Sequence, residues 1–133
     1  MDEPLVVVAP TDQLHRAPHD RLRSEPFIRY ERTVRGRQLA DRYLHEQGIV
    51  PLQRLEINGL MSIAVMVGQG LGMSLLPDWS ALWSGGLPIG RVPLPGHAPV
   101  RRIGVVWGVH SPRALLTERF LKHAPALFEQ VAA

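Results

Sequence analysis

Few residues in this 133-residue chain have the types and spacing that chemistry needs. His15 and His19 have the four-residue spacing of a helical metal pair, but Pro18 lies between them and disfavours a continuous helix. The chain has no cysteine. No serine stands in the Gly-x-Ser-x-Gly sequence of a nucleophile elbow. We therefore predict no metal site and no catalytic residue, and we do not expect an enzyme.

A glycine-rich stretch, residues 68–72 (Gly-Gln-Gly-Leu-Gly), superficially suggests a dinucleotide-binding loop. Such a loop follows a strand and opens a helix, whereas this stretch follows a helical segment and precedes a strand. It is better interpreted as a helix end, in which Gly70 takes left-handed backbone angles and Gly72 lets the chain re-enter a sheet. We predict no cofactor.

Positive charge is concentrated in arginine, which accounts for 14 of the 15 basic residues and contributes to a formal net charge of +3. Eight arginines lie between Arg16 and Arg42, beside four acidic residues. Such a cluster could contact anions or nucleic acid, or it could be a solvated face. No nucleic-acid-binding motif accompanies it, which favours the solvated face.

Strand and helix patterns alternate along the chain, and they predict an α/β sandwich with a mainly parallel sheet flanked by helices. Residues 10–25 show no period and are predicted to be a connecting loop. Ser111 is expected to cap the last helix, and Pro125 to kink or restart it. The predicted strands cover residues 5–9, 26–30, 52–57, 72–76, 87–93 and 100–109. The predicted helices cover residues 36–47, 60–67 and 78–83, and the chain from residue 112 onward.

The predicted helix over residues 60–67 is apolar on nearly all sides, so it must be buried. Asn58 precedes it and is a good N-cap residue. The free N–H groups at a helix start, together with the positive end of its dipole, favour a carboxylate or another anion. Asn58 is therefore interpreted either as a capping residue or as a ligand contact. The tryptophans, Trp79, Trp83 and Trp107, could line a ligand site, but core packing is their more common use.

Residues 60–77 (LMSIAVMVGQGLGMSLLP) resemble the LysR family, in which a helix ending in Val-x-x-Gly-x-Gly runs into a strand ending in Leu-Pro. Three further segments resemble the family in the same order. Residues 5–10 (LVVVAP) are similar to the strand that crosses between two subdomains, and residues 26–30 (PFIRY) to the first strand of the second subdomain. The helix after Ser111 is similar to the closing helix. The resemblance spans almost the whole chain.

The resemblance implies a truncated fold like that of type 2 periplasmic binding proteins. Residues 10–109 would form the second subdomain, and residues 1–9 and 110–133 would be the crossing strand and closing helix of the first. The implied function is sensing of a small-molecule effector by a LysR-type transcriptional regulator, whose DNA-binding helix-turn-helix would lie outside this chain. The alternative is a stand-alone solute-binding protein, which would need an export signal that the N-terminus lacks.

By position, the resemblance implies effector contacts from the loop after the strand over residues 26–30 and from the start of the buried helix. These residues are Tyr30, Glu31, Arg32, Asn58, Gly59 and Leu60. The effector would be a carboxylate or another anion, although a solvated side chain is the more common state of an arginine such as Arg32. Apolar faces left without the first subdomain would promote self-association. The lack of cysteine and of an apolar span fits a cytoplasmic location without a membrane partner.

Overall fold

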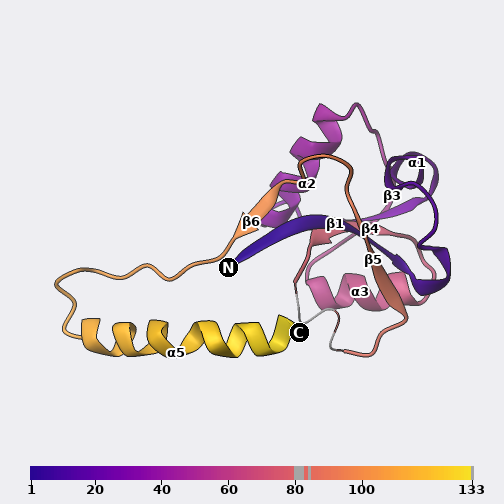
Figure 1. The fold of residues 1–133 in the computed structure, drawn as a ribbon. Helices are drawn as coiled ribbons and strands as arrows, with labels where there is room; N and C mark the ends of the chain where they lie inside the picture. Colours follow the sequence, from indigo (N-terminus) through magenta and orange to yellow (C-terminus); the bar gives the residue numbers. More distant parts are fainter. Residues whose placement is uncertain (80–82, 84, 133) are drawn as a thin grey trace. The chain divides into compact units, whose positions relative to one another are not determined.

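The computed structural model describes residues 1–79, 83 and 85–132, with side chains described as far as residue 126. The chain divides into two units, which we call the larger unit (Asp2–Arg102) and the smaller unit (Met1 and Ile103–Ala133). The elements, drawn in Figure 1, are β1 (Asp2–Pro10), η1 (Thr11–Gln13), α1 (Pro18–Ser24), β2 (Pro26–Tyr30), α2 (Arg35–Glu46), β3 (Leu52–Ile57), α3 (Leu60–Gly68), β4 (Ser74–Pro77), β5 (Ile89–Pro93), β6 (Val100–Arg102) and α5 (Ala114–Ala132). This order confirms the predicted α/β class.

β1 is the central strand of the larger unit, and it pairs antiparallel with β4, β5 and β6. Those three strands therefore share one direction. β3 pairs parallel with β2, and a parallel bridge between Phe27 and Met73 links β2 to the start of β4. Within the described residues, every strand except β1 thus runs the same way, but the three pairings of β1 are antiparallel and only the β2–β3 pairing is parallel. The apolar run of β1 reflects burial on both faces rather than parallel neighbours.

Helices cover both faces of this sheet (Figure 1). Side chains of β1 alternate between two cores because successive residues of a strand point to opposite faces. The α2-side core contains Leu5, Val7 and Ala9 of β1 with Ala40, Tyr43 and Leu44 of α2. The α3-side core contains Val6 and Val8 of β1 with Ile63, Ala64 and Val67 of α3. This two-sided burial confirms the predicted sandwich and places the starts of α2 and α3 on opposite faces of one sheet.

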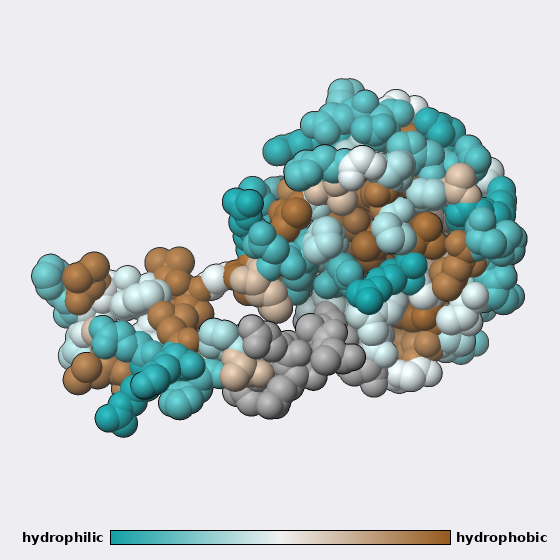
Figure 2. All heavy atoms as spheres, viewed as in Figure 1, coloured by the Kyte–Doolittle hydropathy of each residue, from teal (hydrophilic) through white to brown (hydrophobic). Residues whose placement is uncertain are grey.

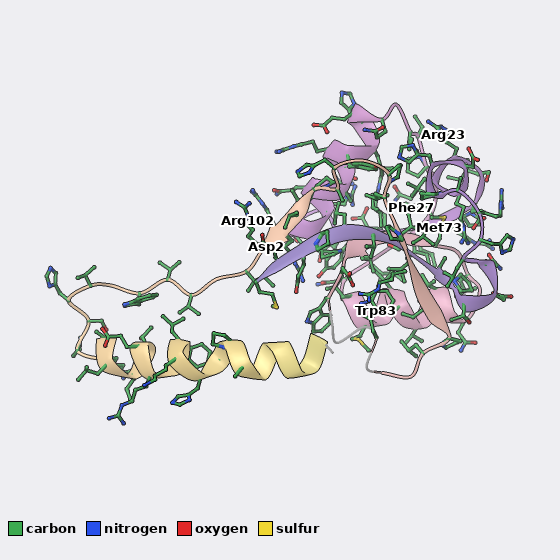
Figure 3. All side chains as sticks on the ribbon, in the orientation of Figure 1. Asp2, Arg23, Phe27, Met73, Trp83 and Arg102 are labelled. Atoms are coloured by element: carbon green, nitrogen blue, oxygen red, sulfur yellow. The ribbon has the colours of Figure 1, made fainter. Side chains whose placement is uncertain are left out.

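Gly72 joins α3 to β4 at a point where the chain passes very close to β2. A Cβ atom on Gly72 would lie 2.5 Å from the backbone oxygen of Pro26, and its φ of +154° is one that other residues rarely adopt. Met73 then donates its N–H to Pro26 at 2.9 Å and accepts from the N–H of Ile28 at 2.9 Å. Figure 3 shows Met73 beside Phe27. The predicted re-entry into the sheet at Gly72 is confirmed.

The prediction of a plain loop over residues 10–25 is wrong, because η1 and α1 lie within it. Pro18 occupies the start of α1, where its missing N–H does no harm. The guanidinium of Arg21 is fully buried and donates to the backbone oxygen of Gln13, to its side-chain oxygen at 3.2 Å, and to Glu25 at 2.9 Å. This helix is too short to show an apolar period in the sequence. A buried ion pair, rather than an apolar stripe, holds it in place.

The predicted strand over residues 100–109 is also wrong beyond Arg102. Met1 exchanges backbone hydrogen bonds with Ile103, but no described strand pairs with residues 104–109. Val105 and Trp107 remain 44 % and 42 % exposed. A strand needs a neighbour for its backbone groups, and the apolar alternation here has no sheet to join.

α5 begins at Ala114, later than the predicted start at residue 112. Ser111 accepts a hydrogen bond from the N–H of Arg113 at 3.2 Å, so it supports the turn before the helix. The helix continues through Pro125, where we predicted a kink or restart, and neither ends nor begins again there. The predicted short helix over residues 78–83 lies largely outside the described residues.

Candidate functional site

The predicted contact residues meet at the edge of the sheet where β2 and β3 end. β2 and β3 are parallel, and Tyr30 pairs with Ile57 at their last positions. The N–H of Glu31 donates to the oxygen of Ile57 at 3.1 Å, which holds the two following loops together. We call residues 30–32 and 58–60 the carboxyl-edge site. The structure thus brings together both segments that the sequence singled out.

The start of α3 provides the backbone donors of this site. Gly59 is the N-cap residue, with φ +102°, and Asn58 is exposed and makes no capping hydrogen bond. The prediction that Asn58 caps the helix is therefore wrong, since it lies one residue too early. The N–H of Ile63 bonds to Gly59, so the N–H groups of the three preceding helical residues have no partner within the helix. Leu60 is buried in the α3-side core and can contribute only its backbone.

Arg37 holds the ends of β2 and β3 at the carboxyl-edge site. The sequence patterns did not identify it as a site residue. Its guanidinium donates to the backbone oxygen of Tyr30 at 3.0 Å and to Asp41 at 2.7 Å. It also forms an ion pair with Glu56 at 3.0 Å. Burial lowers the pKa of Arg37, but its hydrogen bonds to Asp41 and Glu56 outweigh burial and leave that pKa raised. Arg37 therefore stays charged and ties α2 to the ends of β2 and β3.

Arg32 is the exposed cation of the site. Its side chain is 78 % exposed, and its nearest acidic partner, Glu56, is 3.9 Å away. A contact this long at a solvated position contributes little stability. Glu56 is already bonded to Arg37. Arg32 can therefore turn towards a ligand without breaking a strong interaction.

The Arg37–Glu56 pair predicts a dependence of stability on pH. Hydrogen bonding to Arg37 lowers the pKa of Glu56 below its ordinary value of 4.5. The pair therefore stabilises the fold fully above pH 4.5, and this stabilisation is lost as the pH falls through the lowered pKa. We expect the native protein to be more stable than Glu56→Gln at neutral pH, and this difference in stability should shrink on acidification. Urea unfolding of both proteins at neutral and acidic pH measures this, and a constant difference would contradict it.

The family model described as the LysR substrate binding domain matches residues 1–128. The chain belongs to this family. In the comparison with curated protein sequences, nothing matched. The family membership favours the predicted regulator over a stand-alone solute-binding protein.

Solved structures with the same fold include a regulatory domain and an effector binding domain. The CcmR regulatory domain of Synechocystis in complex with 2-PG has a TM-score of 0.70 and 23% identity, covering 96% of this chain and 64% of that one. The effector binding domain of QuiR in complex with shikimate has a TM-score of 0.68 and 19% identity, covering 92% and 63%. An OxyR mutant of Corynebacterium glutamicum has a TM-score of 0.73 and 20% identity, covering 99% and 43%. The LysR-family chain described here thus spans less than two thirds of the length of each of these relatives.

Most arginines of the cluster in this LysR-family domain form ion pairs with acidic residues of the same domain. Within the part of the chain that the structure describes, five of its eight members form ion pairs, and the side chains of two of these, Arg21 and Arg37, are almost completely buried. The pairs are Arg16–Glu25, Arg21–Glu25, Arg29–Asp41, Arg32–Glu56, Arg37–Asp41 and Arg37–Glu56. The predicted solvated face is therefore only part of the explanation, because much of the charge holds elements together.

The remaining candidate residues of the LysR-family domain have structural surroundings. His19 lies 2.7 Å from the hydroxyl of Tyr43, and His15 is exposed. Ser74 donates to the backbone oxygen of Ile28 at 2.7 Å, and Ser62 is exposed. Among the described residues, no group of three histidine or acidic side chains could hold a metal ion. No helix in the part of the chain searched is long and apolar enough to cross a membrane.

Two of the three tryptophans pack against the domain's core. Trp79 and Trp83 contact the α3-side core. Trp83, labelled in Figure 3, donates to Asp78 at 2.6 Å and lies 5.5 Å below the guanidinium of Arg91. Trp107 belongs to the smaller unit. Packing therefore accounts for Trp79 and Trp83 better than a shared ligand wall does.

Proposed function

We propose that this chain is the effector-sensing part of a bacterial LysR-type transcriptional regulator. A small anion binds at the carboxyl-edge site and shifts the balance between conformations of the full regulator, which in turn changes DNA binding and transcription. The observation that carries the proposal is the pairing of the free N–H groups at the start of α3 with the exposed Arg32. A regulator of transcription acts in the bacterial cytoplasm, and we place this one there. It is not an enzyme.

The chemistry of the site favours an anion with a planar or multidentate head group. Backbone N–H groups at a helix start carry partial positive charge and point outward at a ligand. A guanidinium can bind a carboxylate through two parallel hydrogen bonds. The relatives CcmR and QuiR were solved with 2-PG and shikimate, respectively. The ligands of these two relatives support a small organic anion as the class of effector for the chain described here.

Replacing Arg32 with alanine should weaken effector binding without changing the unfolding temperature of the free protein. Arg32 is exposed and weakly paired, so its removal costs the fold little, whereas a bidentate contact to a carboxylate contributes about 1.5–3 kcal/mol. The measurement is the rise in melting temperature with a panel of small carboxylates. The matched control is Arg23→Ala, which removes an exposed arginine from α1. Equal melting shifts for Arg32→Ala and the control would contradict the site.

We also propose that residues 10–109 correspond to the second subdomain of the sensing region, and that residues 1–9 and 110–133 contribute the crossing strand and closing helix of the first. The division of the chain into two units supports a two-part arrangement, although the unit boundary at Arg102 precedes the proposed one. The exposed apolar side chains of the smaller unit support it further. Figure 2 shows hydrophobic surface on α5 and on the extended segment before it.

This arrangement predicts self-association through the smaller unit. Val106 is 97 % exposed, and Leu115 and Leu116 are 74 % and 66 % exposed, which is unusual for a folded monomer. We expect sedimentation velocity at micromolar concentration to show dimers or larger species. Leu115→Ser with Leu116→Ser should shift the distribution towards monomer, whereas Arg119→Ser, a change on the same helix, should not. A purely monomeric native chain would refute this part of the proposal.

A further inference from the structure

A hollow in the larger unit, separate from the carboxyl-edge site, is lined by Asp2, Arg35, Leu39, His97, Val100, Arg101 and Arg102. It contains none of the six residues of the carboxyl-edge site. Its walls come from the first two turns of α2, from the start of β1, from β6 and from the loop before β6. We propose that this hollow binds a second small ligand, an oxyanion with two negative charges, of the phosphate or dicarboxylate class.

The charges around the hollow are not balanced. Arg101 donates to Glu3 at 2.6 Å, and the side chain of Glu3 is almost completely buried, so this pair is committed to the fold. Arg102 lies 3.7 Å from Asp2, and both side chains are more than half exposed. Figure 3 shows these two side by side, where β1 begins and β6 ends. Arg35 has no ion-pair partner among the described residues, which leaves an excess positive charge before His97 is counted.

The position of Arg35 adds to this positive field. It is the first residue of α2, a helix of 12 residues, in which the N–H groups of Arg37 and Gln38 bond to Val34 and those of Arg35 and Gly36 have no partner within the helix. Leu39 lies one turn further along the same helix face, and with Val100 it gives the hollow an apolar part. Basic groups around an apolar floor are a pattern that suits small oxyanions, including those attached to a short carbon chain.

The hollow spans three elements that are far apart in the sequence. β1 and β6 are paired at Asp2–Arg102 and Glu3–Arg101, and α2 packs close to β6. An oxyanion held by Arg35 and Arg102 would therefore tie α2 to the strand pair at which the chain leaves the larger unit. The proposal does not depend on the carboxyl-edge site, because α2 and α3 cover opposite faces of the sheet.

Titration of the ¹⁵N-labelled chain with inorganic phosphate tests the proposal, with succinate as the dicarboxylate probe and sodium chloride at matched ionic strength as the control for screening. We expect saturable shifts of the amide signals of Arg35, His97 and Arg102 with phosphate or succinate but not with chloride. The double variant Arg35→Ala with Arg102→Ala should weaken binding by about tenfold or more, because charge-assisted contacts are lost. Both arginines are exposed, so the fold should persist.

Two matched variants separate this hollow from the carboxyl-edge site. Arg32→Ala and Arg23→Ala should each leave phosphate binding at the hollow unchanged. If Arg32→Ala abolishes the phosphate-induced shifts, or if the shifts occur only at residues 59–62, the anion binds at the carboxyl-edge site and the hollow is refuted. If the double variant binds both probes as tightly as the native chain, or if chloride produces the same shifts, the hollow is likewise refuted.

Discussion

Replacing Gly72 with alanine should destabilise the larger unit by about 3 kcal/mol. The new Cβ atom would lie 2.5 Å from the backbone oxygen of Pro26. A backbone atom cannot move aside as the end of a flexible side chain can. The positive φ adds strain of about 1–3 kcal/mol for any residue other than glycine, and overpacking adds about 1–3 kcal/mol. Urea unfolding followed by circular dichroism would measure the loss.

Gly70→Ala is the matched control for this prediction. Gly70 also has a positive φ, +77°, but a Cβ atom there would meet nothing within 4 Å. Its replacement should therefore cost only the backbone term, about 1 kcal/mol. Equal losses for the two variants would show that contact with Pro26 does not matter. The comparison isolates the close approach that brings β4 beside β2 and so helps to fix the edge on which the carboxyl-edge site is built.

Replacing Arg21 with methionine should destabilise the fold by about 3 kcal/mol. The guanidinium is fully buried, and its loss would leave the backbone oxygen of Gln13 without its donor and Glu25 without its closest buried partner. Removing one member of a buried pair typically costs about 3–5 kcal/mol. We place the value at the low end because Glu25 keeps Arg16, at 2.7 Å. Thermal or urea unfolding provides the measurement.

Arg23→Met serves as the control for Arg21→Met. It lies on the same short helix, α1, and makes the same chemical change, but its side chain is exposed. We expect an effect within about 0.5 kcal/mol, as is usual for surface substitutions. If the two variants were equally stable, the contacts of Arg21 would not hold the segment over residues 10–25 in place.

The elements with strong periodic patterns could be predicted from the sequence. The apolar run of β1 is buried on both faces, and the helix predicted over residues 36–47 forms as α2 and packs Ala40, Tyr43 and Leu44 on the sheet. Local hydrophobic pattern decides these elements because burial is their main source of stability. The direction of β1 relative to its neighbours depends on the path of the whole chain, and no local pattern encodes it.

The failures have equally physical causes. Helix α1 depends on one buried arginine, and a charged residue does not stand out in an apolar pattern. The segment after Arg102 has the alternation of a strand, but alternation cannot supply the neighbouring strand that backbone hydrogen bonding requires. The predicted cap at Asn58 failed because Gly59, with its positive φ, occupies the cap position itself.

The carboxyl-edge site was predictable only in part. The ends of parallel strands lie at one edge of a sheet, so residues 30–32 and 58–60 could be expected to meet once the strands were recognised. Arg37 could not be found in this way, since it acts through Tyr30, Asp41 and Glu56, which come from three different elements. An arginine in the first turn of a helix, where the dipole disfavours positive charge, was the one available signal.

The most direct test of the central claim is to map ligand binding onto the carboxyl-edge site by nuclear magnetic resonance. The ¹⁵N-labelled chain would be titrated to millimolar concentration with a panel of small carboxylates and phosphate esters, including shikimate. At least one probe should move the amide signals of Leu60, Met61 and Ser62 in a saturable way, and Arg32→Ala should weaken that response. If every probe leaves these three signals unmoved, the chain does not sense an anion at the start of α3, and the proposed function is contradicted.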